Sequence, residues 1–173
     1  DNGPVTSQNS WGYMFPDVYE EVVLDAIDYF IAEAGKDENG NQRGPMNGGL
    51  VIFSAGNDNT NANYYPASYE PVLAVASSTH SDIKAQYSNF GSWIDITAPG
   101  GETYEAGGRG VLSTLPGNEY GFFMGTSMAC PHVSGVATLV ISKFGGTAFN
   151  PQMLRERLLR SVDDIDAINP DYA

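Results

Sequence analysis

Apolar residues along the chain follow two spacings, one typical of helices and one typical of buried strands. Over Val18–Ala34 they recur every three or four residues, which predicts an amphipathic helix. Leu50–Ala55 and Val72–Ala76 are nearly continuous apolar runs, as expected of strands covered on both faces of a parallel sheet. The helical spacing returns over Met128–Phe144, and the pair Asn150-Pro151 predicts the start of a last helix.

Each predicted helix has an apolar stripe and an end signal. Gly35 and Gly145 end the first two helices, and Asn169-Pro170 ends the last. The expected stripes are Val18, Val22, Val23, Ala26, Ile27, Phe30, Ile31 and Ala34 in the first helix, Met128, Val133, Val136, Ala137, Val140 and Phe144 in the second, and Leu154, Leu158, Leu159 and Val162 in the last.

The segments between these elements predict shorter structure. Strands with turns are expected at Val5–Gly12, Tyr87–Gly91, Ile94–Gly100 and Val111–Gly117, a hairpin at Asn118–Met124, and a glycine-rich surface excursion at residues 101–110. Strands that alternate with helices in this way favour an α/β domain, with a parallel sheet and helices on both of its faces.

Composition narrows the possible partners. The 173 residues carry a formal net charge of -13, so the surplus of Lys and Arg that nucleic acids and anionic membranes require is missing. Cys130 is the only cysteine, which excludes a disulfide framework and a cysteine-based metal site. No apolar run approaches the length of a membrane span.

The candidate chemistry lies in the run from Gly125 to Ala137, which reads GTSMACPHVSGVA and leads into the second long helix. Ser127 is therefore expected at a helix N-terminus, where unpaired N–H groups and the helix dipole favour developing negative charge. A Gly-x-Ser before a helix also occurs as an ordinary helix cap. These residues alone therefore do not decide whether Ser127 is a nucleophile or part of a cap. Cys130 is interpreted as a buried small side chain and not as a reactive thiol.

The complete run resembles the serine-nucleophile motif of the subtilisin-like serine proteases, or subtilases, in which Gly-Thr-Ser-Met-Ala-x-Pro-His-Val opens a buried central helix. The resemblance implies a subtilisin-like α/β fold, with Ser127 as nucleophile in the Asp-His-Ser hydrolysis of peptide bonds, a chemistry that requires no cofactor. It extends over roughly residues 5 to 165. Subtilase catalytic domains are well over this length, so residues 1–173 are expected to form the C-terminal portion of one such domain.

Asn57 follows the first buried strand, at a carboxyl end where ligand-binding groups gather in open α/β folds. The segment Gly56–Asn59 also fits a plain turn, and the residues alone do not separate the two interpretations. Ala55-Gly56-Asn57 resembles the subtilase Ala-Gly-Asn segment, whose asparagine side chain donates to the oxyanion. The resemblance thus implies an oxyanion role for Asn57 beside the backbone N–H of Ser127.

The substrate cleft is also assigned through the resemblance. Asn9-Ser10-Trp11-Gly12 looks like the extended subtilase segment that pairs with substrate backbone and forms one wall of the primary specificity pocket. Strand addition of this kind holds a peptide by its main chain and leaves selectivity to side-chain pockets. The residues expected to line the cleft are Ser10, Trp11, Gly12, Ala55 and Gly56.

A cation site is the one expected cofactor site. Tyr64–Tyr69 resembles the family's Tyr-Pro-Ala-x-Tyr loop, which in several members holds a weak cation. By position, the resemblance assigns the ligands to the carbonyls of Ala67, Tyr69 and Val72 and to the side chain of Asp95. Hard oxygen ligands suit a structural Ca²⁺ or an alkali cation, although one carboxylate makes a poor site.

The sequence contains no subtilase motif that carries the general base, and no segment of it is assigned to the carboxylate that orients that base. In subtilases the chain order is Asp, His, Ser, and the resemblance places the Asp-x-Gly and His-Gly-Thr motifs N-terminal to Asp1. His80 is interpreted as part of a solvated turn, because catalytic groups meet in space and rarely in sequence. His132, on the nucleophile's own helix, is interpreted as a hydrogen-bonded core histidine. We therefore expect an N-terminal segment of the same domain, carrying Asp and His, as a partner besides the peptide substrate.

The sequence leaves three hypotheses for the function. The first is a serine endopeptidase, expected to be secreted or in the cell envelope from the family resemblance and from the processed, truncated or excerpted look of a chain that starts at Asp1. The second is a catalytically inactive, protease-like binding or scaffold module, which would lack Asp or His upstream. The third, an esterase, is disfavoured because Gly125–Ala129 lacks the second glycine of Gly-x-Ser-x-Gly. Substrate specificity, cation identity and oligomeric state stay open.

Overall fold

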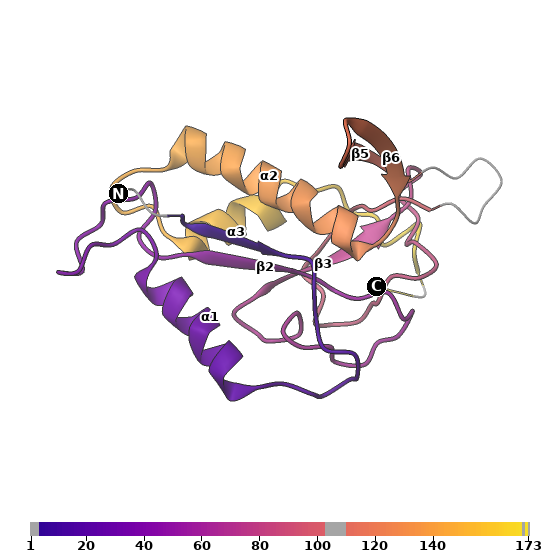
Figure 1. Ribbon diagram of the computed structural model, residues 1–173, viewed down its shortest axis with the longest axis horizontal. Helices are drawn as coiled ribbons and strands as arrows, with labels where there is room; N and C mark the ends of the chain where they lie inside the picture. The colour runs from indigo at the N-terminus through magenta and orange to yellow at the C-terminus, as the bar shows by residue number, and fades with distance from the viewer. Residues whose placement is uncertain (1–3, 103–109, 171, 173) are drawn as a thin grey trace.

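The computed structural model describes residues 4–102, 110–170 and 172. The chain is built around one parallel sheet (Figure 1). Four strands lie in the order β1-β2-β3-β4, all parallel, and β5 and β6 form a separate antiparallel hairpin. The strands are β1 (Thr6–Asn9), β2 (Leu50–Ser54), β3 (Leu73–Ser78), β4 (Ile96–Pro99), β5 (Val111–Leu115) and β6 (Glu119–Phe123). The helices are α1 (Glu21–Glu33), α2 (Thr126–Phe144) and α3 (Pro151–Leu159).

Helices cover both faces of the sheet, as predicted. Alternate side chains of a strand point to opposite faces, so β2 contributes to two cores. Val51 and Phe53 pack with Leu24 and Ile27 of α1 on one face, and Ile52 packs in the cluster that α2 and α3 form on the other. Figure 1 shows α2 and α3 on one side of the sheet and α1 on the other. The α/β class with helices on both faces is confirmed.

The strand register brings the ends of β1 and β2 together. Asn9, the last residue of β1, pairs with Phe53, and Ser54 of β2 pairs with Val75 of β3. Parallel strands place their carboxyl ends at one edge of the sheet, where ligands bind in open α/β folds. α2 contacts all four strands of this sheet. The segments that follow β1 and β2 are thus presented at one edge.

Helix α1 differs from its predicted form. It begins at Glu21 and not at Val18, because the chain is still extended at Glu20. Val22, expected in the buried stripe, is 68% exposed, whereas Leu24, which was not assigned to the stripe, is buried. The face of α1 that packs on the core thus keeps Val23, Ile27, Phe30 and Ile31 from the predicted stripe and adds Leu24.

Three further predictions change in extent. α3 is capped as predicted, with Asn150 Oδ1 accepting from Met153 N at 2.9 Å, but it ends at Leu159, so Val162 lies beyond it and is exposed. Tyr87–Gly91 forms turns and irregular structure in place of a strand. The surface excursion predicted for residues 101–110 falls mostly outside the described residues, which omit 103–109.

One side of the molecule carries uncovered apolar and hydrogen-bonding groups. Among the described residues, β1 pairs with β2 alone, which leaves its second edge without a neighbouring strand. Val136 and Leu139, on the long helix α2, are 48% and 70% exposed. Unpaired strand edges and exposed apolar helix faces are typical of surfaces that bind another part of a protein.

Candidate active site

Ser127 is the second residue of α2, at the helix end that meets the carboxyl edge of the sheet. Gly125 precedes the helix with a φ of 148°, a conformation that strains any residue with a side chain. Gly125 N donates to Gly100 O at 3.0 Å, which ties the start of the helix to the segment after β4. Ser10 Oγ donates to Ser127 O at 2.9 Å, so the segment after β1 also contacts the serine residue.

Asn57 and Thr126 are joined by a pair of hydrogen bonds. Asn57 Oδ1 accepts from Thr126 N at 2.9 Å and from Thr126 Oγ1 at 3.0 Å. Thr126 Oγ1 in turn accepts from Gly56 N at 3.2 Å. Because the acceptor end of the Asn57 amide is committed to Thr126, its Nδ2 donor group takes no part in these bonds. Thr126 itself is completely buried, whereas Asn57 is exposed.

Two N–H donors surround one point above Gly125. A Cβ placed on this glycine would lie 3.6 Å from Ser127 N and 3.7 Å from both Asn57 Nδ2 and Asn57 Oδ1, the oxygen that accepts from Thr126. The two nitrogens are donors, and Ser127 N belongs to the positive end of a helix dipole. An oxygen that gains negative charge near this point would be stabilised by both. The structure thus brings together the two residues for which the sequence suggested an oxyanion role.

The predicted cleft residues lie along the ends of β1 and β2. Ser10, Trp11 and Gly12 are exposed, and Ala55 is buried behind the half-buried Gly56. The Trp11 ring packs edge-on against Phe53, with the ring centroids 5.1 Å apart, which fixes a large aromatic side chain beside the open edge. All five residues lie at the carboxyl edge that also holds Ser127 and Asn57.

Two of the four residues assigned to a cation, Asp95 and Val72, are already in contact with a positive group. Arg155 of α3 forms an ion pair with Asp95, and its Nη1 donates to Val72 O at 2.9 Å. Tyr69 O accepts from Val72 N at 2.9 Å. Burial raises the pKa of the Asp95 carboxyl, and the bonds from Ala74 N and Arg155 oppose that rise. The only carboxylate of the set therefore has a cationic partner from the chain itself.

The histidines and the cysteine take no part in the candidate site. His80 is exposed in a turn, as predicted. His132 was expected in the core; its Nδ1 does contact Met128 O at 2.8 Å, but the side chain is exposed, because nothing in the described residues covers that face of α2. Cys130 is completely buried, and burial raises the pKa of its thiol, so the reactive thiolate is disfavoured.

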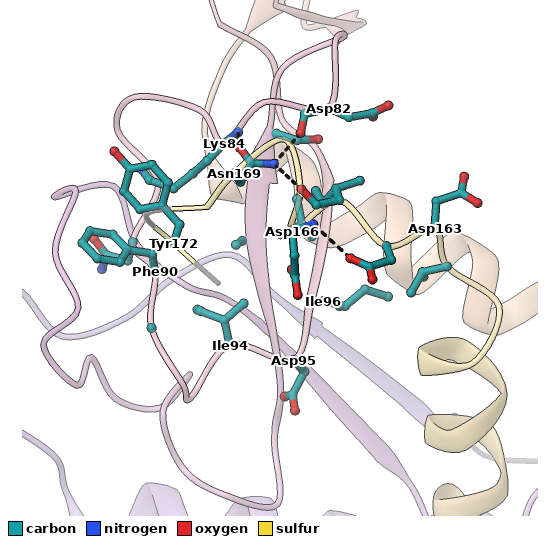
Figure 2. Close-up of a pocket in the computed structure, with 18 of the residues that line it drawn as sticks. Asp82, Lys84, Phe90, Ile94, Asp95, Ile96, Asp163, Asp166, Asn169 and Tyr172 are labelled. Atoms are coloured by element: carbon teal, nitrogen blue, oxygen red, sulfur yellow. Dashed lines mark hydrogen bonds between the residues drawn. The ribbon is translucent and has the colours of Figure 1, made fainter.

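The cavity drawn in Figure 2 lies apart from these residues, between β3, β4 and the segment after α3. It measures about 660 Å³, and of the predicted site residues only Asp95 lines it. Lys84 has its Nζ bonded to Asn59 Oδ1 at 2.8 Å and to Ser88 O at 2.9 Å. Asn169 Nδ2 donates to Asp82 O at 2.9 Å on the same side of the cavity. Lys84 and Asn169 thus hold the loops around the cavity together.

Sequence analysis did not identify two buried polar residues that support the site. Thr126 was noted only as part of the motif, although it binds Asn57 and Gly56. Asn89 was placed in a predicted strand, whereas it is a completely buried side chain that contacts the backbone around Asn57. Neither residue has a sequence signal beyond being a polar side chain near an aromatic or apolar one, and such a signal does not reveal the partner.

We expect Thr126→Val to lower the free energy of unfolding by about 1–3 kcal/mol, because Gly56 N loses its buried acceptor and Asn57 loses a donor. Thr126→Ser is the matched control, since it keeps the hydroxyl and removes one methyl group at a cost of about 0.8 kcal/mol. Denaturant unfolding of the complete folded protein measures both. Equal stability of the wild type and Thr126→Val would contradict the assigned hydrogen bonds.

Comparison with known proteins gives the same family throughout. The subtilase family model matches residues 4–172. The chain is 38% identical over 126 residues to thermitase from Thermoactinomyces vulgaris, covering 73% of this chain and 41% of that protein. It is 43% identical over 117 residues to an extracellular protease from Xanthomonas campestris pv. campestris, covering 66% of this chain and 20% of that protein.

A solved structure supports the same assignment. The crystal structure of a cold-adapted subtilisin-like serine proteinase superposes with a TM-score of 0.66 at 28% identity, covering 89% of this chain and 46% of that one. The chain thus spans less than half the length of each of these three proteins. With the family model matched along nearly all of its length, this chain belongs to the subtilase family.

Proposed function

We propose that the chain is the nucleophile-bearing part of a serine endopeptidase and that Ser127 attacks the scissile carbonyl. The observation that carries the proposal is the pairing of Asn57 Oδ1 with Thr126, which leaves Asn57 Nδ2 and Ser127 N around a single point beside the serine. Membership of the subtilase family supports the reaction class, and the position of Ser127 at the start of α2 supports its role.

The proposed reaction assigns a role to each of these groups. Ser127 Oγ forms a bond to the carbonyl carbon while its proton passes to a histidine base, and the carbonyl π pair moves onto the oxygen. Asn57 Nδ2 and Ser127 N donate to that oxyanion. Collapse of the intermediate breaks the C–N bond as the base returns the proton to the leaving amine. Water then releases the acyl group from Ser127 by the same steps.

Peptide binding is assigned to the open edge formed by the ends of β1 and β2. Ser10–Gly12 lies exposed along this edge, and Tyr13 N donates to Tyr65 O at 3.0 Å, which holds the segment in place. An extended substrate can hydrogen-bond to exposed main chain there, next to Ala55 and Gly56. Trp11, 48% exposed and packed on Phe53, provides apolar surface for one substrate side chain. The substrate class is thus a peptide or protein in extended conformation.

The histidine base and its aspartate are assigned to a segment of the same catalytic domain N-terminal to Asp1. The chain covers 41% of thermitase and 20% of the Xanthomonas protease, so both relatives include long regions that it does not match. The unpaired edge of β1 and the exposed Val136 and Leu139 of α2 offer a surface on which such a segment would pack. Residues 1–173 would then be the C-terminal portion of the domain.

Secretion is the proposed location. The relative from Xanthomonas is described as an extracellular protease. In the part of the chain that the structure describes, no helix combines the length and the apolar character needed to cross a membrane.

We expect a fluorophosphonate probe to label Ser127 in the protein that includes the N-terminal segment. The chain 1–173 alone should label far more slowly, because Ser127 Oγ then lacks a base. Mass spectrometry of the labelled peptide identifies the modified residue, and Ser127→Ala is the control that should remove the signal. A folded complete protein without labelling would overturn the proposal and favour a catalytically inactive binding or scaffold module.

We expect Asn57→Ala to lower kcat while KM changes little, because the lost donor acts on the oxyanion and not on the bound substrate. The loss should be on the order of 10² to 10³, a magnitude that comes from subtilisin itself, a member of this family. Asn41→Ala is a matched control, since that exposed side chain binds Asp37 in the loop before β2. Steady-state hydrolysis of a chromogenic peptide measures both, and a wild-type kcat in Asn57→Ala would exclude the oxyanion role.

A further inference from the structure

Asn89 lies beneath the turn that carries Asn57. Its side chain comes from the loop between β3 and β4 and is completely buried. Asn89 Nδ2 donates to Ala55 O at 2.9 Å, and Asn89 Oδ1 accepts from Asp58 N at 2.9 Å. Asn89 N donates to Gly56 O at 3.1 Å. These bonds reach the backbone on both sides of Asn57.

The fit between this turn and Asn89 leaves little room for movement. Gly56 has a φ of +104°, and a Cβ on it would lie only 2.5 Å from Asn89 Nδ2. Asn89 is itself fixed, because Ser88 Oγ donates to Asn89 O at 3.0 Å and accepts from Ser77 N of β3 at 2.9 Å. The turn is therefore tied to the sheet through a buried chain of hydrogen bonds.

We infer that Asn89 is a positioning residue for the oxyanion donor, an inference that rests on the proposed function. Thr126 orients the side-chain amide of Asn57, and Asn89 fixes the backbone from which that side chain projects. Both constraints are needed, since an electrostatic donor is effective only when it is held in place before the charge develops. Asn89 does not touch the reacting atoms.

The test is a double-mutant cycle between Asn89→Asp and Asn57→Ala in the complete protein. Asn89→Asp keeps the shape but sets an oxygen against Ala55 O in place of a donor. We expect kcat to fall about 10- to 100-fold with KM changed less than about 3-fold, because a displaced donor loses only part of its effect. In the Asn57→Ala background the same change should cost less than about 3-fold, because the donor is already gone.

Asn169→Asp is the matched control for the cycle. Asn169 is another buried asparagine that joins two loops, with Nδ2 donating to Asp82 O and Oδ1 accepting from Lys84 N. It should lower the melting temperature without lowering kcat. If Asn89→Asp does not fold, Asn89→Ser takes its place in the cycle.

Two results would overturn the inference while leaving the proposed function intact. One is an unchanged kcat in a folded Asn89 variant, and the other is an equal loss of kcat with and without Asn57. Failure of the proposed function appears differently, as a wild-type protein without hydrolysis or labelling of Ser127.

A second, independent observation concerns Arg155. Its guanidinium reaches from α3 to the segment before β4 and forms an ion pair with Asp95. It also donates to Val72 O at 2.9 Å, at the start of β3. Both groups are among the four that the family resemblance assigned to a metal cation. Asp95 also accepts from Ala74 N at 2.8 Å, and the carboxylate of Glu70 is the other charged group that acts on it.

A Ca²⁺ or alkali cation does not fit this set of residues. Such ions need several oxygen ligands with free lone pairs and, for Ca²⁺, net negative charge. Here the single carboxylate is neutralised, and one of the three carbonyls is used by the same guanidinium. We propose that Arg155 permanently takes the place of the cation, so that this part of the fold is stable without a bound metal.

Thermal melting in excess calcium chloride, potassium chloride or EDTA tests the replacement in the complete protein. The difference in melting temperature between salt and EDTA should be the same in the wild type and in Asp95→Asn, because no ion binds at Asp95. Arg155→Met should melt several degrees lower in EDTA and recover part of that loss with Ca²⁺ or K⁺. The recovery should vanish in the Arg155→Met, Asp95→Asn double variant.

Arg157→Met is the matched control, because Arg157 also lies on α3 but stacks on the Phe144 ring at 4.0 Å and not on a carboxylate. It should show the wild-type response to salt. If Arg155→Met does not fold, Arg155→Gln replaces it. Two results would overturn the proposal. One is a salt-dependent rise in the melting temperature of the wild type that Asp95→Asn reduces. The other is an Arg155 variant whose melting temperature does not rise with either salt.

Discussion

The arrangement of the site depends on the hydrogen bonds that join Asn57 Oδ1 to the main chain and hydroxyl of Thr126. A primary amide offers an acceptor at one end and donors at the other, so fixing the oxygen also fixes the direction of the nitrogen. This contact connects the end of β2 to the start of α2, which are 69 residues apart in the chain. The sheet register and the helix position are both required before the contact can form.

The exposed Asn57 side chain of the candidate site is held by buried polar residues. Asn57 is exposed and would have many rotamers on an isolated turn, and freezing it would cost conformational entropy. Thr126 and Asn89 are both completely buried, so one partner of each of their hydrogen bonds is held in place by the core, and the Asn89 bond to Ala55 O is buried at both ends. Stability of the fold and preorganisation of the site are therefore supplied by the same few contacts.

Sequence patterns predicted the parts of the structure that depend on local spacing. The runs of β2 and β3, the course of α2 and the Asn150 cap were correct because burial on both faces and helix ends leave direct signals in the chain. Ser127 at a helix N-terminus and Asn57 beyond the carboxyl end of β2 were also placed correctly. Asn89 and Arg155 could not be assigned, because their partners lie 34 and 60 residues away and no short pattern encodes such pairs.

The failed expectation for His132 has a physical explanation of the same kind. His132, Val136 and Leu139 are spaced by four and three residues, so they share one face of α2. All three are exposed, although His132 already has its Nδ1 in contact with Met128 O, as a core histidine would. Under the proposed function, a segment that brings the base to Ser127 and packs on this face of α2 would cover all three side chains. Covering that face and completing the catalytic group would then be two consequences of one packing event.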